Sequence, residues 1–227
     1  MRVKAFSLAC AVVLAGVIHG FVPFGADAQE LDAVPRVEER GKGAEMSGPM
    51  FEIKQTIDRI TEQLRTIGST PAWRDNVSKL VRSKFNFEVM SQGVLGPNWH
   101  KASQQERERF VDLFSQLLEE TYIGRVREYT GQMIRFGVEQ IRENRAVVDT
   151  YIAMDTGNEI PISYKMLKNG AEWQVYDVVI EEVSLVRNYR SSYASILRKK
   201  NVSGLLTEMQ AKIEELQQRH AIEDRNA

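Results

Sequence analysis

The spacing of apolar residues changes twice along this chain, and these changes constrain the fold class. Residues 51–126 repeat apolar positions every three or four residues, which is typical of amphipathic helices. Residues 133–181 repeat them every two, which is typical of strands with one buried face. After Ser184 the helical spacing returns. Helices, then a block of strands, then helices again predict an α+β fold rather than alternating βαβ units.

The strand block predicts four strands in an antiparallel meander. Gly157-Asn158 and Asn169-Gly170 are turn signals, and such short connections join neighbouring antiparallel strands. The helices are then expected on one face of a curved sheet or around its edges. In the first strand, alternation predicts that Ile134, Phe136 and Val138 lie on one face. In the last strand, it predicts that Trp173, Val175, Asp177 and Val179 lie on one face.

Two helix boundaries are marked by particular residues. Ser103 followed by Glu106 is a capping box, and helical apolar spacing continues from Phe110 onward. Asn201 and Gly204 interrupt the helical pattern near the C-terminus. We therefore predict a long capped helix before the strands and a pair of helices after them.

The first 28 residues have the features of a secretory signal peptide. Arg2 and Lys4 precede an apolar run over residues 5–18, and a small-x-small cleavage pattern ends at Ala28. The alternative is a membrane anchor, for which this run is short. Cleavage would remove Cys10, the only cysteine, so we expect an exported protein without disulfides. The predicted divisions are a signal peptide (1–28), a flexible segment (29–50), one α+β domain (51–222) and a tail (223–227).

Composition argues against several classes of function. Lys plus Arg number 30 and Asp plus Glu 31, a net charge of -1, so no bulk attraction to nucleic acid is expected. No nucleotide-binding, serine-hydrolase or zinc-protease motif occurs, and three histidines with one cysteine cannot build a Cys/His zinc array. We predict no cofactor, no metal site and no nucleic-acid partner. His100 and His220 are assigned surface roles.

Two aspartates and one basic cluster have more than one interpretation. Asp149 and Asp177 interrupt apolar strands, and a carboxylate in an apolar cavity has a raised pKa and can act as a base. Alternatively, each faces solvent or pairs with a neighbouring cation such as Lys165. The basic residues 198–200 suit a lipid phosphate, an anionic membrane or an acidic partner, and equally suit the C-terminal end of a helix.

A series of short sequence words occurs in a fixed order over roughly residues 50–216. The words are Phe85-x-Phe87-Glu88-x-Met90, Val94-Leu95-Gly96-x-x-Trp99, Ala102-Ser103, Arg109-Phe110, Phe114, Leu117-Leu118-x-x-Thr121-Tyr122, Ile160-Pro161-Ile162-x-Tyr164, Trp173-Gln174-Val175-Tyr176-Asp177-Val178, Ser184-Leu185-Val186-x-Asn188-Tyr189-Arg190-Ser191 and Gly204-Leu205-Leu206. Together they resemble the MlaC family, also called the toluene-tolerance family, of periplasmic phospholipid-binding proteins. The chain departs from the family at Glu181-Glu182, where the family word has a Gly before Val-Ser.

The resemblance implies a fold and a non-enzymatic activity. The fold is a set of helices packed on a curved, mainly antiparallel sheet of four or five strands, similar to the NTF2-like shape with added helices. Such proteins carry phospholipid across the periplasm between an outer-membrane lipoprotein and an inner-membrane ABC transporter complex with an MCE-domain subunit, which maintains outer-membrane lipid asymmetry. A related branch is associated with hopanoid synthesis loci, so a hopanoid-associated carrier stays open as an alternative.

Alternation also selects residues for the lining of an apolar cavity between the helices and the sheet. We expect this lining to contain Phe110, Leu117 and Tyr122 from the helices, and Phe136, Val148, Ile152, Ile162, Tyr164, Trp173 and Val175 from the strands. Arg190 is a candidate for headgroup or structural pairing. Three functions stay open: a lipid carrier, an NTF2-like enzyme that uses Asp149 or Asp177, and an interaction module with a filled core.

Overall fold

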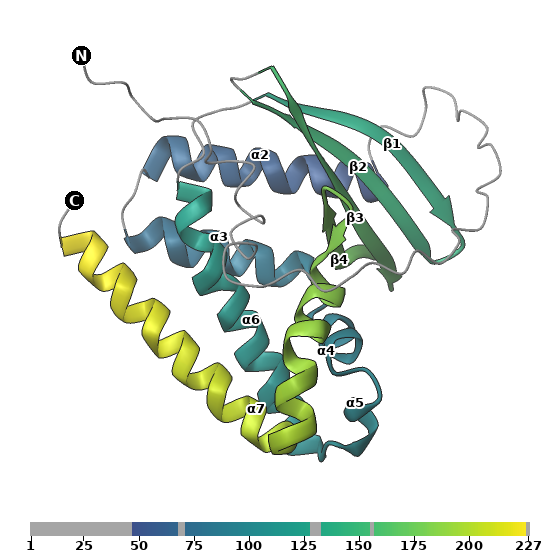
Figure 1. The fold of residues 1–227 in the computed structure, drawn as a ribbon. Helices are drawn as coiled ribbons and strands as arrows, with labels where there is room; N and C mark the ends of the chain where they lie inside the picture. The colour runs from purple at the N-terminus through teal and green to yellow at the C-terminus, as the bar shows by residue number, and fades with distance from the viewer. Residues whose placement is uncertain (1–46, 68–70, 128–132, 155–156, 226–227) are drawn as a thin grey trace.

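The computed structural model describes residues 47–67, 71–127, 133–154 and 157–225 (Figure 1). The helices are α2 (Pro49–Ile67), α3 (Pro71–Lys84), α4 (Phe87–Leu95), α5 (Asn98–Lys101), α6 (Gln104–Arg127) and α7 (Leu185–Arg225). The strands are β1 (Ile134–Arg142), β2 (Arg145–Ala153), β3 (Glu159–Asn169), β4 (Glu172–Ile180) and β5 (Val183–Ser184). This order confirms the predicted α+β class.

Part of the predicted organisation falls outside the described residues. The predicted signal peptide, residues 1–28, lies there, as does the predicted flexible segment up to residue 46. Near the C-terminus, α7 takes in residues 223–225 of the predicted tail. Among the helices that the structure describes, none combines the length and the apolar content that a bilayer crossing requires.

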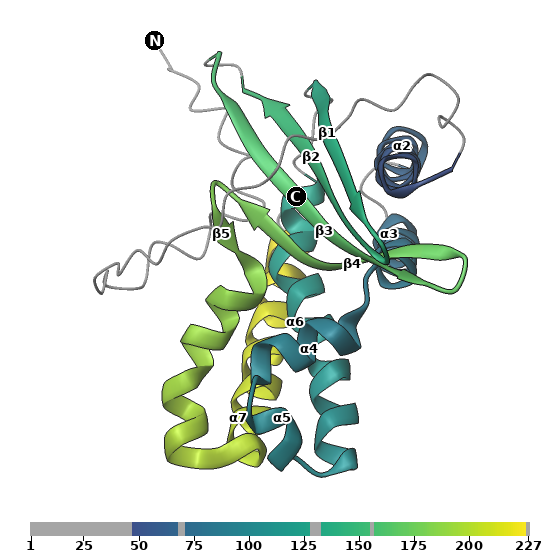
Figure 2. The same cartoon turned by 90° about the vertical axis from the view of Figure 1, so that its right-hand side faces the viewer.

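The sheet is an antiparallel meander in which each strand pairs with the next along the chain. Figure 2 shows that the strands twist and curve rather than lying flat. A fifth strand, β5, adds two residues beyond the four strands that the spacing predicts. It pairs with β4 through a two-residue turn in which Glu181 and Glu182 have φ angles of 45° and 69°.

Two bulges change which residues face the core. The register of β1 shifts between Phe136 and Glu139, and Val138 is 52% exposed. Between β3 and β4, Lys165 pairs with Asp177 and Met166 pairs with Val175. Tyr176 of β4 is therefore the extra residue of this bulge. Beyond that bulge the buried core positions are Val178 and Ile180. The predictions that Val138 shares one face of β1 with Ile134 and Phe136, and that Asp177 and Val179 share one face of β4 with Trp173 and Val175, are therefore wrong.

Three clusters of buried apolar residues hold these elements together. The helical core joins α4, α6 and α7, with Phe110, Phe114 and Leu205 at its centre. The sheet core joins α2 to the inner face of the sheet, with Ile53 packed among strand residues such as Val148. The third and smallest, the bridging cluster, is formed by Trp73, Val77 and Ile123 and joins α3 to α6.

The helix α7 is divided at Asn201, as the sequence predicts. Asn201 has φ 57° and ψ -165°, which is not helical, and its side chain accepts a hydrogen bond from Gly204 N–H at 3.3 Å. The second arm of α7 folds back along α6 (Figure 1). The capping box of α6 is also confirmed, because the Ser103 Oγ accepts from Glu106 N–H at 3.2 Å and the Glu106 carboxylate accepts from Ser103 N–H at 2.9 Å.

Candidate functional site

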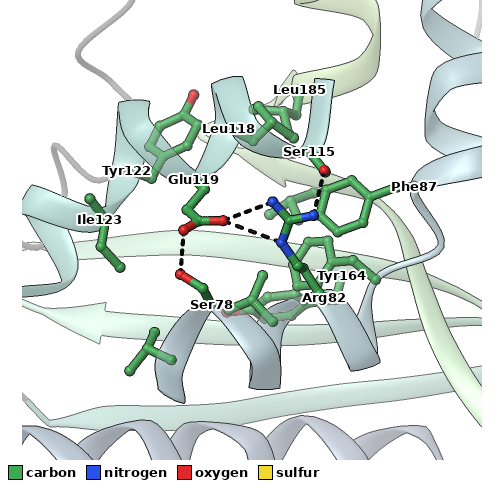
Figure 3. Close-up of a pocket in the computed structure, with 14 residues that line it drawn as sticks. Ser78, Arg82, Phe87, Ser115, Leu118, Glu119, Tyr122, Ile123, Tyr164 and Leu185 are labelled. Carbon is green, nitrogen blue, oxygen red and sulfur yellow. Dashed lines mark hydrogen bonds and ion pairs between the residues drawn. The ribbon is translucent and has the colours of Figure 1, made fainter. Parts of the chain in front are cut away.

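An apolar pocket of about 180 Å³ lies where the three clusters approach one another (Figure 3). The helices α3 and α6 form opposite walls, and β3, β4 and the start of α7 close the inner end. The apolar lining residues are Val77, Val81, Phe85, Phe87, Leu118, Tyr122, Ile123, Tyr164, Val178 and Leu185. Polar lining is confined to Ser78, Arg82, Ser115 and Glu119. A space lined in this way suits hydrocarbon rather than a polar metabolite.

Helical spacing explains why the two walls present apolar side chains to the pocket. Val77 and Val81 are four residues apart on α3, and Phe85 follows at the end of that helix. On α6, Leu118 and Tyr122 are also four apart. Residues at this spacing lie one above the other on a single helix face. Each wall is therefore a continuous stripe rather than a set of isolated contacts.

Four polar residues connect the two walls, and we call them the polar clasp: Ser78, Arg82, Ser115 and Glu119. Ser78 Oγ donates to the Glu119 carboxylate at 2.6 Å, and Arg82 Nη2 donates to its other oxygen at 3.1 Å. Arg82 Nη1 donates to Ser115 Oγ at 2.9 Å. The Arg82 side chain is 41% exposed and that of Glu119 is 25% exposed, so solvent screens this ion pair and it contributes about 0.5 kcal/mol. The clasp is thus a weak and reversible link between α3 and α6.

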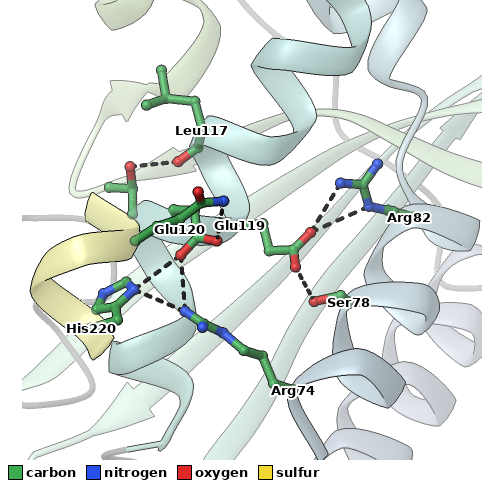
Figure 4. A network of polar contacts seen from close by, with 9 residues as sticks. Arg74, Ser78, Arg82, Leu117, Glu119, Glu120 and His220 are labelled. Atoms are coloured by element: carbon green, nitrogen blue, oxygen red, sulfur yellow. Dashed lines mark hydrogen bonds and ion pairs between the residues drawn. The ribbon is translucent and has the colours of Figure 1, made fainter. Parts of the chain in front are cut away.

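A second polar network joins α3, α6 and the end of α7 (Figure 4). The Glu120 carboxylate accepts from Arg74 Nη2 at 2.9 Å and lies 3.0 Å from His220 Nδ1. It also accepts from Gln217 Nε2 at 3.3 Å. The His220 side chain is only 16% exposed, so it does not have the surface position that its place near the C-terminus suggests. The network fixes the base of α3, whereas the clasp links its C-terminal half.

The structure places the ten predicted lining residues in three different surroundings. Tyr122 and Tyr164 line the pocket. Phe110 and Leu117 belong to the helical core, and Val148, Ile152, Ile162, Trp173 and Val175 belong to the sheet core, with Phe136 packed against it. Alternation therefore identified residues that face inward, and most of them meet other side chains there. The residues that sequence reasoning did not select are chiefly those of α3, although Val77 and Val81 are part of its visible apolar spacing.

Arg190 and the two strand aspartates lie away from the pocket lining. The exposed Arg190 donates from Nε to the Gly93 carbonyl at 2.6 Å, which attaches α7 to α4. Asp149 accepts from Ser163 Oγ at 2.6 Å. Asp177 accepts from Lys165 Nζ at 3.2 Å, and also from Ser184 Oγ and Val186 N–H at the start of α7. The pairing of Asp177 with Lys165 is one of the two arrangements that the sequence left open.

Within the part of the chain that the structure describes, no group of three or more His, Cys, Asp and Glu side chains is placed to hold a metal ion. The basic residues 198–200 are exposed at the end of the first arm of α7, and Lys200 pairs with Glu208 at 2.7 Å.

The family model of the MlaC protein matches residues 52–211, which include α3, α6, the sheet and most of α7. The chain belongs to the MlaC family. Among MlaC relatives, the intermembrane phospholipid transport system binding protein MlaC of Haemophilus influenzae is 27% identical over 174 residues, covering 72% of this chain and 81% of the relative. The toluene tolerance protein Ttg2D of Pseudomonas putida is 21% identical over 156 residues, covering 68% of this chain and 72% of the relative.

A solved structure supports the MlaC fold independently. The phospholipid-binding protein from Ralstonia solanacearum, determined in complex with a phospholipid, aligns with a TM-score of 0.64 and 23% identity. The alignment covers 74% of this chain and 97% of that protein. At this identity the likeness establishes a shared fold, and it confirms the architecture of helices on a curved antiparallel sheet that the sequence words imply.

Proposed function

We propose that this MlaC-family protein is a non-enzymatic phospholipid carrier that shields acyl chains in the apolar pocket between α3 and α6. The observation that carries the proposal is the lining itself, with aliphatic and aromatic side chains inside and polar groups confined to the clasp. Asp149 and Asp177, the two candidate bases, are outside that lining, which favours a carrier over an enzyme.

The energetics of lipid transfer support a carrier that has no catalytic group. Each methylene kept from water is worth about 0.8 kcal/mol, so two acyl chains carry a transfer cost on the order of 20 kcal/mol. Free passage through an aqueous compartment is therefore negligible. A carrier has to offer a dry space and then release the lipid to a partner that competes for it.

The volume of the pocket implies that it widens on loading. Its volume of about 180 Å³ is below the ~300 Å³ at which ordinary small-molecule pockets begin. The wall best suited to move is the C-terminal half of α3, because the small bridging cluster and the weak clasp link it to α6 above the polar network at its base, whereas α6 and α7 share the larger helical core. Loading should therefore displace α3 from α6.

The proposed route of the lipid follows from the predicted leader and the family. We propose that residues 1–28 direct the protein to the periplasm and are removed there. Phospholipid would then pass between an outer-membrane lipoprotein and an inner-membrane MCE-domain/ABC transporter complex, which maintains outer-membrane lipid asymmetry. The same pocket chemistry would serve a hopanoid-associated lipid, and the identity of the bound lipid separates the two branches.

The direct test is native mass spectrometry of the protein purified from a periplasmic extract. We expect a co-purifying phospholipid in the wild type and its loss in Val81→Trp, which fills the pocket from the α3 wall. We place the substitution at Val81 rather than at Val148 or Ile162, because those two side chains are packed in the sheet core and a tryptophan there would unfold the protein. The matched control is Val138→Trp, the same change at a position 52% exposed on β1, which should retain lipid. Equal lipid content in Val81→Trp and the wild type would contradict the proposal.

A further inference from the structure

An outer groove, formed by α4, α5 and α6, adjoins the apolar pocket. Arg82, Phe87 and Ser115 line both spaces, so the clasp stands at their boundary. The groove is open to solvent and has a volume of about 700 Å³. On its outer side it is lined by Trp99, Arg107 and several carboxylates. A molecule whose tail occupies the pocket would have its polar end in this groove.

Arg107 is a cation with unused hydrogen-bonding capacity inside the groove. Its Nε is buried and has no hydrogen-bond partner in the described part of the chain. Its Nη2 donates only a long bond of 3.4 Å to the His100 carbonyl, and the guanidinium lies 5.5 Å from the centre of the Trp99 ring. The guanidinium of an arginine placed beside an aromatic ring can donate paired hydrogen bonds to an anion such as a phosphate.

Two carboxylates of the groove, those of Glu88 and Glu108, form no ion pair with the residues that the structure describes. Glu88 accepts from the Gln92 amide at 3.4 Å, and Glu108 accepts from the Gln104 amide at 2.9 Å. Both line the groove together with Arg82 and Arg107. Asp112 also lines the groove and pairs with Arg109 at 2.9 Å. The two guanidinium groups with the carboxylates of Glu88 and Glu108 form a mixed-charge surface, which suits a zwitterion better than a ligand of net negative charge.

We propose that the outer groove is a headgroup site for a zwitterionic phospholipid of the phosphoethanolamine class. Arg107 and Arg82, which both line the groove, bind the phosphate, and Glu88 and Glu108 attract the ammonium group. This inference rests on the proposed lipid-carrying function. It assigns a binding site to the polar headgroup, the part of the lipid that the apolar pocket does not recognise. The clasp would then exchange one anion for another, because Arg82 faces both Glu119 and the groove.

The test uses delipidated protein incubated with vesicles of equal amounts of phosphatidylethanolamine and phosphatidylglycerol, followed by native mass spectrometry. We expect the wild type to retain phosphatidylethanolamine preferentially, and Arg107→Gln to retain about 5-fold less of it, since a partly exposed charge-assisted hydrogen bond is lost. Arg219→Gln, the same change at an exposed residue of α7 that pairs with Glu215, should behave as the wild type. In Glu88→Gln/Glu108→Gln, the ratio of phosphatidylglycerol to phosphatidylethanolamine should rise about 5-fold.

The outcomes separate this proposal from the carrier function. A wild type that retains no lipid contradicts the carrier function itself. A wild type that retains lipid, with unchanged amounts and ratios in folded Arg107→Gln and Glu88→Gln/Glu108→Gln, overturns the headgroup site alone. Glycerophosphoethanolamine, which has no acyl chains, should not displace the lipid, because the chains supply most of the binding free energy. Saturable, Arg107-dependent binding of that fragment would assign the groove to soluble phosphate esters and overturn its assignment to a lipid headgroup.

Discussion

At the scale of single residues, two tyrosines of α7 differ in the partners of their hydroxyl groups. Tyr193 packs edge-on against Phe110 with ring centres 6.4 Å apart, and its buried hydroxyl has no hydrogen-bond partner among the described residues. Burial raises the pKa of the Tyr189 hydroxyl, and interactions with the side chains of Thr121 and Tyr122, the latter a residue of the pocket lining, oppose that rise. A buried hydroxyl without a partner destabilises the folded state, whereas a bonded one does not.

We therefore expect Tyr193→Phe and Tyr189→Phe to have opposite effects. Tyr193→Phe should raise the free energy of unfolding by about 1 kcal/mol, because it removes an unsatisfied polar atom at nearly constant volume. Tyr189→Phe should lower it by about 1 kcal/mol, because it removes the polar interactions of this hydroxyl with Thr121 and Tyr122. Urea unfolding followed by circular dichroism measures both, and a greater loss in Tyr193→Phe than in Tyr189→Phe would show that the hydroxyl has a partner in solution.

The same tyrosine predicts how stability changes at alkaline pH. Burial, with a smaller contribution from Tyr189, raises the pKa of Tyr193 well above its ordinary value. The unfolded chain loses this proton near the ordinary tyrosine pKa of about 10, whereas the folded protein keeps it. The Tyr193 hydroxyl should therefore leave the free energy of unfolding unchanged below pH ~10. Above that pH the free energy of unfolding should fall, until the pH reaches the pKa of Tyr193 in the folded protein. In Tyr193→Phe, unfolding at fixed urea between pH ~9 and ~11 should show a shallower fall than in the wild type.

Residue patterns predicted which side chains point inward but not what they meet there. Tyr122 and Tyr164 line the pocket, whereas Val148 and Trp173 follow the same alternation and pack against other side chains. A side chain that lines the pocket and one that packs in the core are both removed from water, so both produce the same alternation of apolar residues in the sequence. The distinction depends on the distance between α3 and α6, which no local pattern contains.

At the scale of elements, the turn between β4 and β5 stores backbone strain. Glu181 and Glu182 both have left-handed φ angles, and two like charges are adjacent. Two-residue hairpin turns with positive φ favour Asn-Gly or Asp-Gly, because glycine adopts this conformation without a steric penalty. The family word has a glycine before Val-Ser, which is the position of Glu182 in this chain.

Glu182→Gly should therefore stabilise the protein. A left-handed residue other than glycine costs about 1–2 kcal/mol. The greater freedom of glycine in the unfolded chain offsets about 0.5–1 kcal/mol of this, so a net gain of about 0.5 kcal/mol is expected. Thermal unfolding by calorimetry would detect it as a rise in Tm. Glu172→Gly makes the same change at the start of β4, where φ is not positive, and should lower Tm; a fall in both variants would argue against strain at the turn.

Element order, the capping box of α6 and the break at Asn201 were all predictable, because each depends on neighbouring residues. The bulges in β1 and β4 were not predictable, because the sequence of one strand does not show which residue is inserted. The inserted residue becomes evident only when pairing with the neighbouring strand fixes the register. That is why Val138 and Val179 were assigned to the wrong face.

At the scale of the whole molecule, the pocket exists because three apolar clusters approach one another without merging. The bridging cluster contributes two buried residues, Trp73 and Val77, to the α3 side, and the helical core holds the α6 side. Local stability should differ between the two walls accordingly, since segments with few buried contacts open more easily.

Hydrogen exchange measured by mass spectrometry tests this difference. In delipidated protein, amides of α3 should exchange at least 10-fold faster than those of the central turns of α6, and loading with phosphatidylethanolamine vesicles should slow exchange in α3 more than in α4. Val138→Trp serves as a variant that should load in the same way. Equal protection of α3 and α6 before loading would mean that α3 is not the movable wall.

The reversal of α7 at Asn201 has a practical consequence. It returns the last turns of the helix to α3, where His220 meets Arg74 at 2.8 Å, while Ile222 beyond them is 51% exposed. The only native cysteine, Cys10, belongs to the predicted leader, so a cysteine introduced at position 222 would be a unique site for dye attachment in the exported form. A fluorophore there would follow the movement of α3 from outside the cargo space, and so provide a continuous optical signal of loading and discharge.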